Sequence, residues 1–148
     1  MEAKTILLVE DNADDEILTL RAFRKHALAN EVVVARDGGE ALDYLFATGG
    51  HSACEKTTMP ALILLDLKLP VLDGLEVLRR IRADARTSFL PVVILTSSKL
   101  DEDLISSYRL GCNSYVRKPI DFVAFTEAVR QLGIYWLLLN EQPPHYRI

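Results

Sequence analysis

Apolar and polar residues follow two patterns along this chain: short continuous apolar runs, and apolar residues at helical spacing. Five short apolar runs, rich in residues that favour β-structure, predict strands at residues 4–9, 31–36, 61–65, 91–95 and 114–116. The run at 61–65 (ALILL) is apolar at every position, which is typical of a central strand buried on both faces. In the segments between the runs, apolar residues recur with helical periodicity, so strands and helices are expected to alternate.

Apolar residues three or four positions apart predict a helix after each strand. The helices are expected at residues 14–29, 40–47, 75–83, 100–110 and 122–138. Asp14, Asp15 and Glu16 crowd the first turn of the first helix, where the helix dipole favours anions. Residues 37–39 (DGG) predict a turn, and residues 48–60 form a polar loop longer than most in α/β units.

Residues at three helix ends carry recognisable capping chemistry. Ser98 with Asp101 resembles a capping box at the start of the fourth helix. Gly111 is expected just after the end of that helix, where a left-handed conformation is common. Asp121 is expected to cap the start of the fifth helix.

Five strand–helix units predict one α/β domain with a doubly wound, five-stranded parallel sheet, (βα)5. Right-handed crossovers then place helices on both faces of the sheet. We assign residues 1–139 to this domain and residues 140–148, which contain Pro143 and Pro144, to a C-terminal extension. Ligands of such sheets bind outside the carboxyl ends of the strands, so the candidate residues are those that directly follow each strand.

Those positions hold acids, hydroxyls and a lysine. Asp66 follows the third strand and is the candidate nucleophile for phosphoryl transfer to a carboxylate. Asp11 and Asp66 are the best direct ligands for Mg²⁺ (or Mn²⁺), which prefers hard oxygen donors. Glu10 is expected to act on the same ion through water, and the backbone carbonyl of Lys68 is a further candidate ligand.

Two more positions suit the phosphoryl group itself. Lys118, after the fifth strand, would pair with phosphoryl oxygens as a point charge. Thr96, after the fourth strand, would donate its hydroxyl to the same oxygens, with Ser97 beside it. Positioning and charge neutralisation are most of what phosphoryl transfer needs.

The four motifs together resemble a two-component response-regulator receiver domain over residues 3–139. They are LLVEDN, LILLDLKLP followed by DG, VVILTSS, and SYVRKP, with Thr96 30 residues after Asp66 and Lys118 22 residues after Thr96. The resemblance implies a flavodoxin-like receiver fold and a phosphoryl group taken by Asp66 from a sensor histidine kinase. It also implies that Tyr115 is a switch aromatic, which turns inward when Thr96 moves to the phosphoryl group.

A finer resemblance is to the small single-domain regulators paired with cyanobacterial and bacterial phytochrome kinases. It rests on the VEDN start, the long loop after the second helix, LPVVILT and the C-terminal IYWLLLNEQPP. It implies a phytochrome partner. Three positions depart from the family pattern: Glu10, where aspartate is often first in the acidic pair, Ser97, where small residues are frequent, and Lys68, two residues after the acceptor. Glu10 still suits metal binding, and Ser97 is expected to alter access to the site or the rate of dephosphorylation. For Lys68 two alternatives stay open: it holds the phosphoryl group longer, or it steers a partner.

Bulk properties limit the remaining functions. The formal net charge is −4 and basic residues are scattered, which argues against a nucleic-acid partner. We expect no signal peptide and no membrane span, because the first residues lead straight into a strand and the apolar runs are short. Cys54 and Cys112 lack metal-type spacing, so we expect reduced thiols in a cytoplasmic protein. His51 with Cys54 offers too few ligands for a metal site.

The fifth predicted helix is unusually apolar. One stripe faces the core, and its members are Phe122, Phe125, Val129, Leu132, Trp136 and Leu139. The residues expected off this stripe form an apolar patch, and they are Ile134, Tyr135, Leu137 and Leu138. Such a patch predicts a homodimer through the fourth helix, fifth strand and fifth helix, unless the proline-rich tail folds back over it.

Two alternatives of other classes remain open. A phosphohydrolase with an aspartyl-phosphate intermediate wants a second aspartate two residues after the nucleophile, where this chain has Lys68. A degenerate receiver would act only as a dimerising interaction module, and the intact Asp11, Asp66, Thr96 and Lys118 argue against it. Singly, each of these residues has an ordinary structural explanation as a turn, cap or solvated charge. We expect no metabolic enzyme, only Mg-dependent self-phosphorylation from a donor and slow autodephosphorylation.

Overall fold

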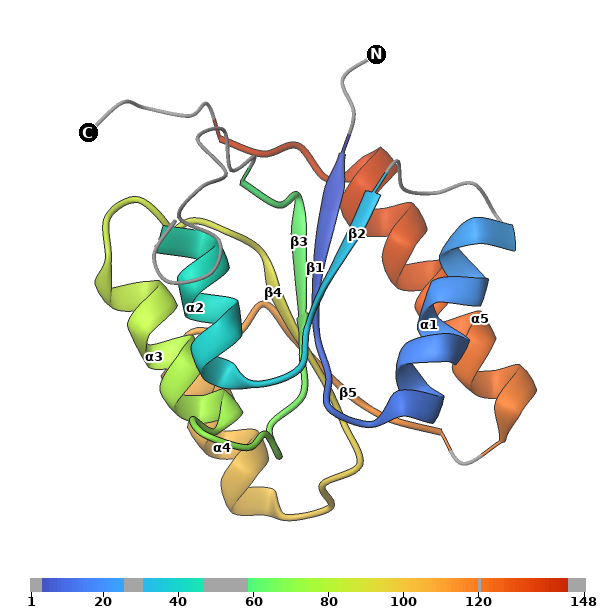
Figure 1. The fold of residues 1–148 in the computed structure, drawn as a ribbon, viewed down its shortest axis with the longest axis horizontal. Helices are drawn as coiled ribbons and strands as arrows, with labels where there is room; N and C mark the ends of the chain where they lie inside the picture. Colours follow the sequence, from blue (N-terminus) through green and yellow to red (C-terminus); the bar gives the residue numbers. More distant parts are fainter. Residues whose placement is uncertain (1–3, 26–30, 47–58, 120, 144–148) are drawn as a thin grey trace.

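The computed structural model describes residues 4–25, 31–46, 59–119 and 121–143. Five parallel strands form one sheet in the order β2-β1-β3-β4-β5 (Figure 1). Their bounds are Thr5–Val9 (β1), Glu31–Ala35 (β2), Leu62–Leu65 (β3), Val92–Thr96 (β4) and Ser114–Arg117 (β5). The predicted doubly wound α/β fold is therefore confirmed, and its strand order reverses beside β1.

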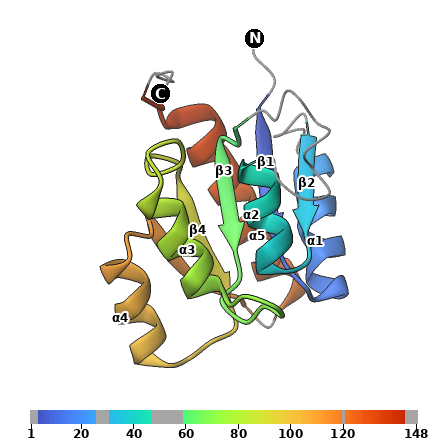
Figure 2. The ribbon, with the colours of Figure 1, turned by 60° about the vertical axis from the view of Figure 1, so that its left-hand side comes forward.

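Helices cover both faces of the sheet. Their bounds are Ala13–Lys25 (α1), Gly38–Phe46 (α2), Gly74–Ala83 (α3), Asp101–Arg109 (α4) and Phe122–Gly133 (α5), with a π-helix at Ile134–Leu139 (η2). Helices α1 and α5 pack together on one face, and α2 and α3 lie on the other with α4 beyond them (Figures 1 and 2). Gly38 and Gly39, predicted as part of a turn, instead begin α2.

Each buried strand serves two cores because successive side chains point to opposite faces. Leu7, Ile63 and Ile94 join the core under α2 and α3. Leu8 and Leu64 join the core under α1 and α5. All of β1, β3 and β4 is buried, which explains why their sequences are apolar without alternation.

Side-chain caps confirm one predicted helix start and correct another. Asp121 Oδ2 accepts a hydrogen bond from Ala124 N at 3.0 Å at the start of α5. The capping box at Ser98 and Asp101 was a wrong prediction, because Leu100 is the N-cap of α4 and makes no side-chain cap. Ser98 lies two residues earlier, and its hydroxyl donates to Asp103 Oδ2 at 2.5 Å.

Gly111 follows α4 as predicted, with a φ of 98° that a side chain rarely adopts. Its carbonyl accepts a hydrogen bond from Arg82 Nε at 2.8 Å. The same guanidinium donates to Leu90 O at 2.7 Å and to Asn113 Oδ1 at 2.9 Å. Arg82 therefore ties the end of α3 to the segments that lead into β4 and β5.

The last helix departs from the predicted stripe. Phe125 and Val129 are buried as expected, but the α-helix ends at Gly133 and a wider π turn follows. Asn140 N donates to Tyr135 O at 2.7 Å, five residues back, as a π turn requires. This turn changes which residues face the core.

Three predictions about that stripe and its patch are wrong. Leu137, placed off the stripe, is fully buried, whereas Leu139, placed on it, is 66% exposed. Phe122, at the other end of the predicted stripe, is also more than half exposed. Tyr135 and Leu138 are exposed as predicted, and Ile134 is half-buried.

The described part of the tail contacts the amino end of the sheet. Gln142 Nε2 donates to Ala61 O at 2.8 Å, and Lys4 Nζ donates to Leu137 O. Within the described residues, Phe122–Leu139 is one helical stretch long and apolar enough, by length and composition alone, to cross a membrane. Its buried residues pack on the sheet, which gives its apolar character an ordinary reason. Cys112 is a buried free thiol, whereas Cys54 and His51 lie outside the described residues.

Candidate functional site

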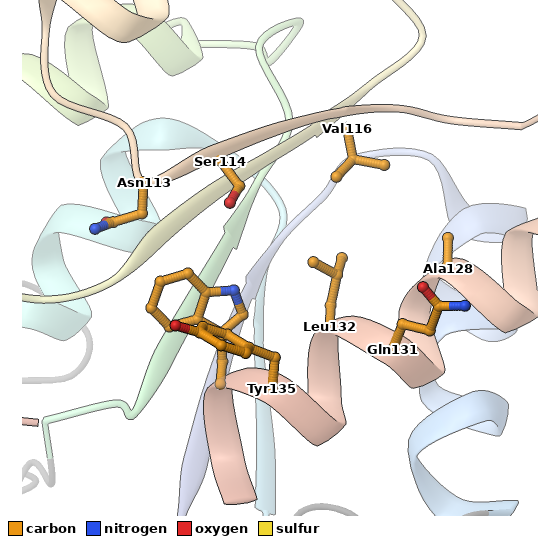
Figure 3. A pocket seen from close by; sticks show the side chains of 8 residues that line it. Asn113, Ser114, Val116, Ala128, Gln131, Leu132 and Tyr135 are labelled. Carbon is orange, nitrogen blue, oxygen red and sulfur yellow. The ribbon is translucent and has the colours of Figure 1, made fainter. Parts of the chain in front are cut away.

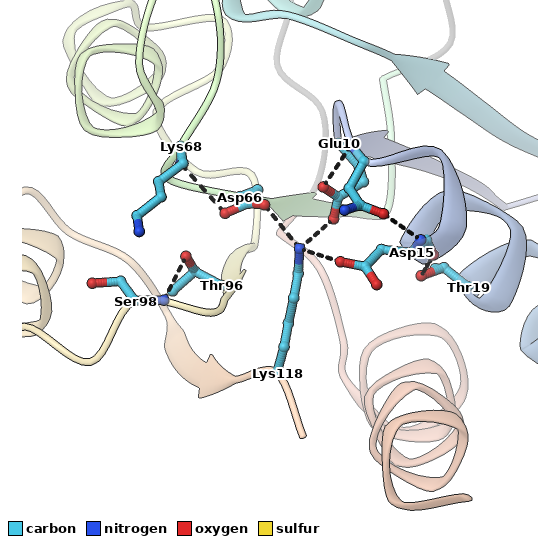
Figure 4. Close-up of polar contacts among 9 residues, drawn as sticks. Glu10, Asp15, Thr19, Asp66, Lys68, Thr96, Ser98 and Lys118 are labelled. Carbon is cyan, nitrogen blue, oxygen red and sulfur yellow. Dashed lines mark hydrogen bonds and ion pairs between the residues drawn. The ribbon is translucent and has the colours of Figure 1, made fainter. Parts of the chain in front are cut away.

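The register of the sheet brings the predicted site residues to one edge. Val9 of β1 pairs with Leu65 of β3, so the next residues, Glu10 and Asp66, are neighbours. Thr96 at the end of β4 accepts a hydrogen bond through its carbonyl from Lys118 N at 2.8 Å. Figure 4 shows the side chains of Glu10, Asp66, Thr96 and Lys118 converging outside the strand ends.

Asp66 is 6% exposed and sits at the mouth of the site. Its Oδ1 accepts from Lys68 N at 3.3 Å, and its Oδ2 faces Lys118. The glycine of the DG motif has a steric role here, because a Cβ on Gly74 would lie 2.3 Å from Asp66 O. Gly74 N also donates to Leu67 O at 2.9 Å, which folds the loop after the acceptor back onto it.

Lys118 holds three carboxylates at once. Its Nζ lies 2.7 Å from Glu10 Oε1, 2.8 Å from Asp66 Oδ2 and 2.9 Å from Asp15 Oδ2. Its side chain is 8% exposed. Burial alone would lower the pKa of the ammonium, but the attraction of the Asp66 charge and the hydrogen bonds that Lys118 donates to Asp66, Glu10 and Asp15 outweigh it and raise that pKa. Lys118 is therefore a permanent positive charge beside Asp66.

The environment of Glu10 favours its neutral form, whereas that of Lys118 favours the charged form. Burial raises the pKa of this carboxyl to about 7, and the charge of Asp66 adds to the rise, although Lys118 and the amide of Asn12 pull it down. Asn12 N donates to Glu10 Oε2 at 3.2 Å. Near neutral pH the site has more negative charge than Lys118 can balance.

Three carboxylates are placed to share a cation. Glu10, Asp11 and Asp66 each offer an oxygen, and these atoms lie within 4.8 Å of one another. Asp11 is exposed, so the group opens to solvent on its side. Hard oxygens at this spacing fit Mg²⁺ or Mn²⁺, and the excess negative charge favours either ion. When bound, such an ion neutralises charge on phosphoryl oxygens.

The predicted role of the Lys68 carbonyl as a further ligand stays a prediction. Lys68 itself is exposed, and only its amide contacts Asp66.

The hydroxyl-bearing residues lie on the β4 side of the site. Thr96 is fully buried, and its Oγ1 accepts from Ser98 N at 3.3 Å. Ser97 is exposed. The Tyr115 ring is half-buried and packs against the core under α3, and its hydroxyl has no hydrogen-bond partner among the described residues. Burial raises the pKa of this phenol. The switch role of Tyr115 stays a prediction, with the ring already inward in this structure.

Asp15 is the member of the site that the sequence analysis missed. Its acidic neighbours in α1 made it look like ordinary first-turn charge. The available signal was its position in the first turn of α1, four residues after Asp11 of the acidic pair. Only the fold shows that the end of β5 meets this turn.

A second concave region lies at the β5 edge of the sheet, away from Asp66. This groove of about 520 Å³ runs between β5 and the α5–η2 segment (Figure 3). Val116, Leu132, Tyr135 and Trp136 form its apolar part. The exposed residues Leu138 and Leu139 continue this apolar surface along η2.

Known proteins with similar sequences belong to the family that the site residues predict. The sequence profile described as the response regulator receiver domain matches residues 6–130. This chain belongs to the response regulator receiver family. The Probable methanogenesis regulatory protein FilR2 of Methanothrix harundinacea is 41% identical over 140 residues, covering 93% of this chain and 86% of FilR2. Response regulator Rcp1 of Synechocystis sp. is 37% identical over 134 residues, covering 90% and 89%.

Solved receiver structures superpose closely. The phosphorylated cyanobacterial phytochrome response regulator RcpA has a TM-score of 0.90 at 37% identity, covering 97% of this chain and 100% of RcpA. The Mn²⁺-bound form of Rcp1 has a TM-score of 0.88 at 35% identity, with 95% and 99% covered. The bacteriophytochrome response regulator AtBRR has a TM-score of 0.75 at 53% identity, with 95% and 100% covered. The receiver is thus similar to phytochrome response regulators.

Proposed function

We propose that this protein is a stand-alone response regulator that accepts a phosphoryl group on Asp66 from a sensor histidine kinase. An Asp66 oxygen attacks phosphorus, the P–N bond of the phosphohistidine breaks, and the imidazole nitrogen leaves with the electron pair and takes up a proton. The observation that carries the proposal is Lys118 Nζ at 2.8 Å from Asp66 Oδ2, beside three carboxylates that can hold Mg²⁺.

The residues around Asp66 would have different roles in phosphoryl transfer. Glu10, Asp11 and Asp66 would hold the cation, and Lys118 would turn from carboxylate to phosphoryl oxygens. Thr96, fully buried at the end of β4, would donate its hydroxyl to the phosphoryl group and report the change toward α4. The chain then acts as a switch with slow autodephosphorylation and not as a metabolic enzyme. A phosphohydrolase fits less well, because an exposed lysine, Lys68, stands where the general acid is needed.

The upstream kinase is proposed to be a phytochrome, in the cytoplasm. Support comes from the likeness to RcpA and to AtBRR, both described as phytochrome response regulators. FilR2, which is also similar, is described as a methanogenesis regulator, so similarity to receivers does not by itself select the signal. Phosphoryl transfer from purified kinases tests this choice. Faster transfer from a phytochrome kinase than from an unrelated kinase is expected, and equal rates would refute it.

Phosphorylation itself is tested with acetyl phosphate. Incubation with Mg²⁺ should add one phosphoryl group to the intact mass of the wild-type protein, and removal of the divalent ion with a chelator should prevent it. Asp66→Asn should stay unmodified, whereas Asp101→Asn, at an exposed site on α4, should behave as wild type. An unmodified wild type, or equal modification of Asp66→Asn, would refute the proposal.

The output surface is proposed to be α4, β5 and α5–η2, with a homodimer formed there. Ile105 and Tyr108 of α4 and Tyr135 and Leu138 of η2 are exposed apolar residues on the elements that flank β5, the edge strand of the sheet, and exposed apolar patches usually mark interfaces. Leu137 takes no part, since it is buried in the core. The alternative of a receiver that only dimerises would keep this surface and dispense with phosphorylation.

Sedimentation at micromolar concentration tests the dimer. Wild type should be dimeric in at least one phosphorylation state, and Leu138→Glu should shift it to monomer. Ile17→Glu, which alters another exposed apolar residue, on α1, is the matched control. Monomeric wild-type protein in both states would remove the homodimer from the proposal.

A further inference from the structure

Asp15 occupies one of the three hydrogen-bonding positions of Lys118. An ammonium group has three hydrogens, and Glu10, Asp66 and Asp15 each accept within 2.9 Å (Figure 4). Glu10 and Asp66 also belong to the carboxylate group that can hold a cation. Asp15 is outside that group, and its carboxylate contacts Lys118.

The start of α1 holds Asp15 in this position. Asn12 Oδ1 accepts from Asp15 N at 3.0 Å and caps the helix. Thr19 Oγ1, fully buried one turn later, donates to Asp15 O at 2.8 Å. The side chain of Asp15 is 25% exposed, more than those of Glu10 and Asp66, so water can solvate its carboxylate when Lys118 moves away.

A phosphoryl group on Asp66 changes the demand on Lys118. Its oxygens need a donor, and all three hydrogens of the ammonium are already engaged. The contact with Asp15 is therefore in competition with the new one. Asp15 Oδ2 and Asp66 Oδ2 flank the same nitrogen and lie within about 6 Å of each other, so the Asp15 charge also repels the phosphoryl anion.

Resting on the proposed function above, we infer that Asp15 is a positioning residue that weakens the hold of the site on phosphoryl groups. It keeps Lys118 partly turned toward α1 and adds a negative charge beside the acceptor. Both effects act in one direction: they limit how readily the site is filled by a phosphoryl donor.

Steady phosphorylation by acetyl phosphate at saturating Mg²⁺ separates this role from a structural one. Asp15→Asn keeps the size and the cap but removes the charge, so the half-saturating concentration of acetyl phosphate should fall about three- to tenfold. The maximal rate should change less than the half-saturating concentration, because the nucleophile and its cation ligands are unaltered. Asp15→Glu, which restores a carboxylate within reach of Lys118, should return the value toward wild type.

Asp14→Asn is the matched control, because Asp14 is an exposed acid in the same first turn of α1 and the substitution makes the same change to the charge at the helix end. It should leave the half-saturating concentration near the wild-type value. An unchanged or higher value in Asp15→Asn would overturn the inference, and so would an equal fall in Asp14→Asn or a failure of Asp15→Glu to restore it. A wild type that takes up no phosphoryl group would instead refute the proposed function, and this inference with it.

Discussion

Removal of the Lys118 charge should destabilise the metal-free protein. Its partners Glu10 and Asp66 have side chains only 3% and 7% exposed, so neither can gain much from water after Lys118→Met. Breaking a buried ion pair by removing one partner costs about 3–5 kcal/mol. Glu10 offsets part of this by taking up a proton, so we expect a loss of about 3 kcal/mol in the free energy of unfolding at pH 8.

The loss should depend on pH in a defined direction. Without Lys118 the Glu10 carboxyl has a folded-state pKa above its unfolded value, because burial and the charge of Asp66 raise the pKa and the lowering hydrogen bond to Lys118 is gone. Such a group stabilises the native state at low pH, and that contribution is lost as pH rises through the folded pKa. The destabilisation is therefore expected to be smaller at pH 6 than at pH 8.

Urea denaturation in the presence of a chelator measures the effect, and Mg²⁺ supplies a second test. A bound cation replaces the missing positive charge, so saturating Mg²⁺ should recover much of the stability of Lys118→Met. Lys99→Met, at an exposed lysine beyond β4, should cost less than about 0.5 kcal/mol. A loss below about 1 kcal/mol at pH 8, or a loss that Mg²⁺ does not reduce, would refute this account of the site's electrostatics.

Three further predictions concern the cation site, the loop after the acceptor and the π-helix. Because the pKa of Glu10 is raised to about 7, its proton competes with Mg²⁺ for the carboxylate. The affinity for Mg²⁺, measured by calorimetry, should therefore increase as the pH is raised toward 7, by up to about tenfold per pH unit. In Glu10→Gln this dependence on pH should become much weaker. Val71 has a φ of 69° and is exposed, so Val71→Gly should raise the urea-derived free energy of unfolding by about 0.5–1 kcal/mol; a loss would contradict the strain. Leu137→Ala should cost about 2–5 kcal/mol but Leu138→Ala under about 0.5, whereas equal costs would rule out the π register.

Much of the site was predictable because its residues directly follow predicted strands. Asp66 and Thr96 directly follow apolar runs, and in a parallel sheet all carboxyl ends share one edge. The predicted convergence of Glu10, Asp66, Thr96 and Lys118 is what the structure has. Asp15 was missed because its role depends on a contact between α1 and the end of β5, and sequence spacing within α1 says nothing about distance to β5.

Local sequence also failed where packing competes with periodicity. A continuous α-helical stripe would bury Leu139 beside Trp136, yet in the wider turn at Ile134–Leu139 it is Leu137 that is fully buried, with Trp136 partly buried and Leu139 exposed. Both registers satisfy the apolar pattern, because nearly every residue from 134 to 139 is apolar. The choice between them depends on the fit against the sheet and on contacts made at the start of β3 by residue 142.

By itself, the order of apolar runs and strand-end residues predicted the fold class, the edge where the site lies and Asp66 as the candidate phosphoacceptor. These features follow from rules that act along the chain: the two-residue period of strands, the direction of parallel strands and the reactivity of side chains. Tertiary structure alone decided the register of the last helix, the partners of Lys118 and the raised pKa of Glu10. Each of those depends on desolvation and on distances between groups far apart in sequence, and neither quantity exists before the chain is folded.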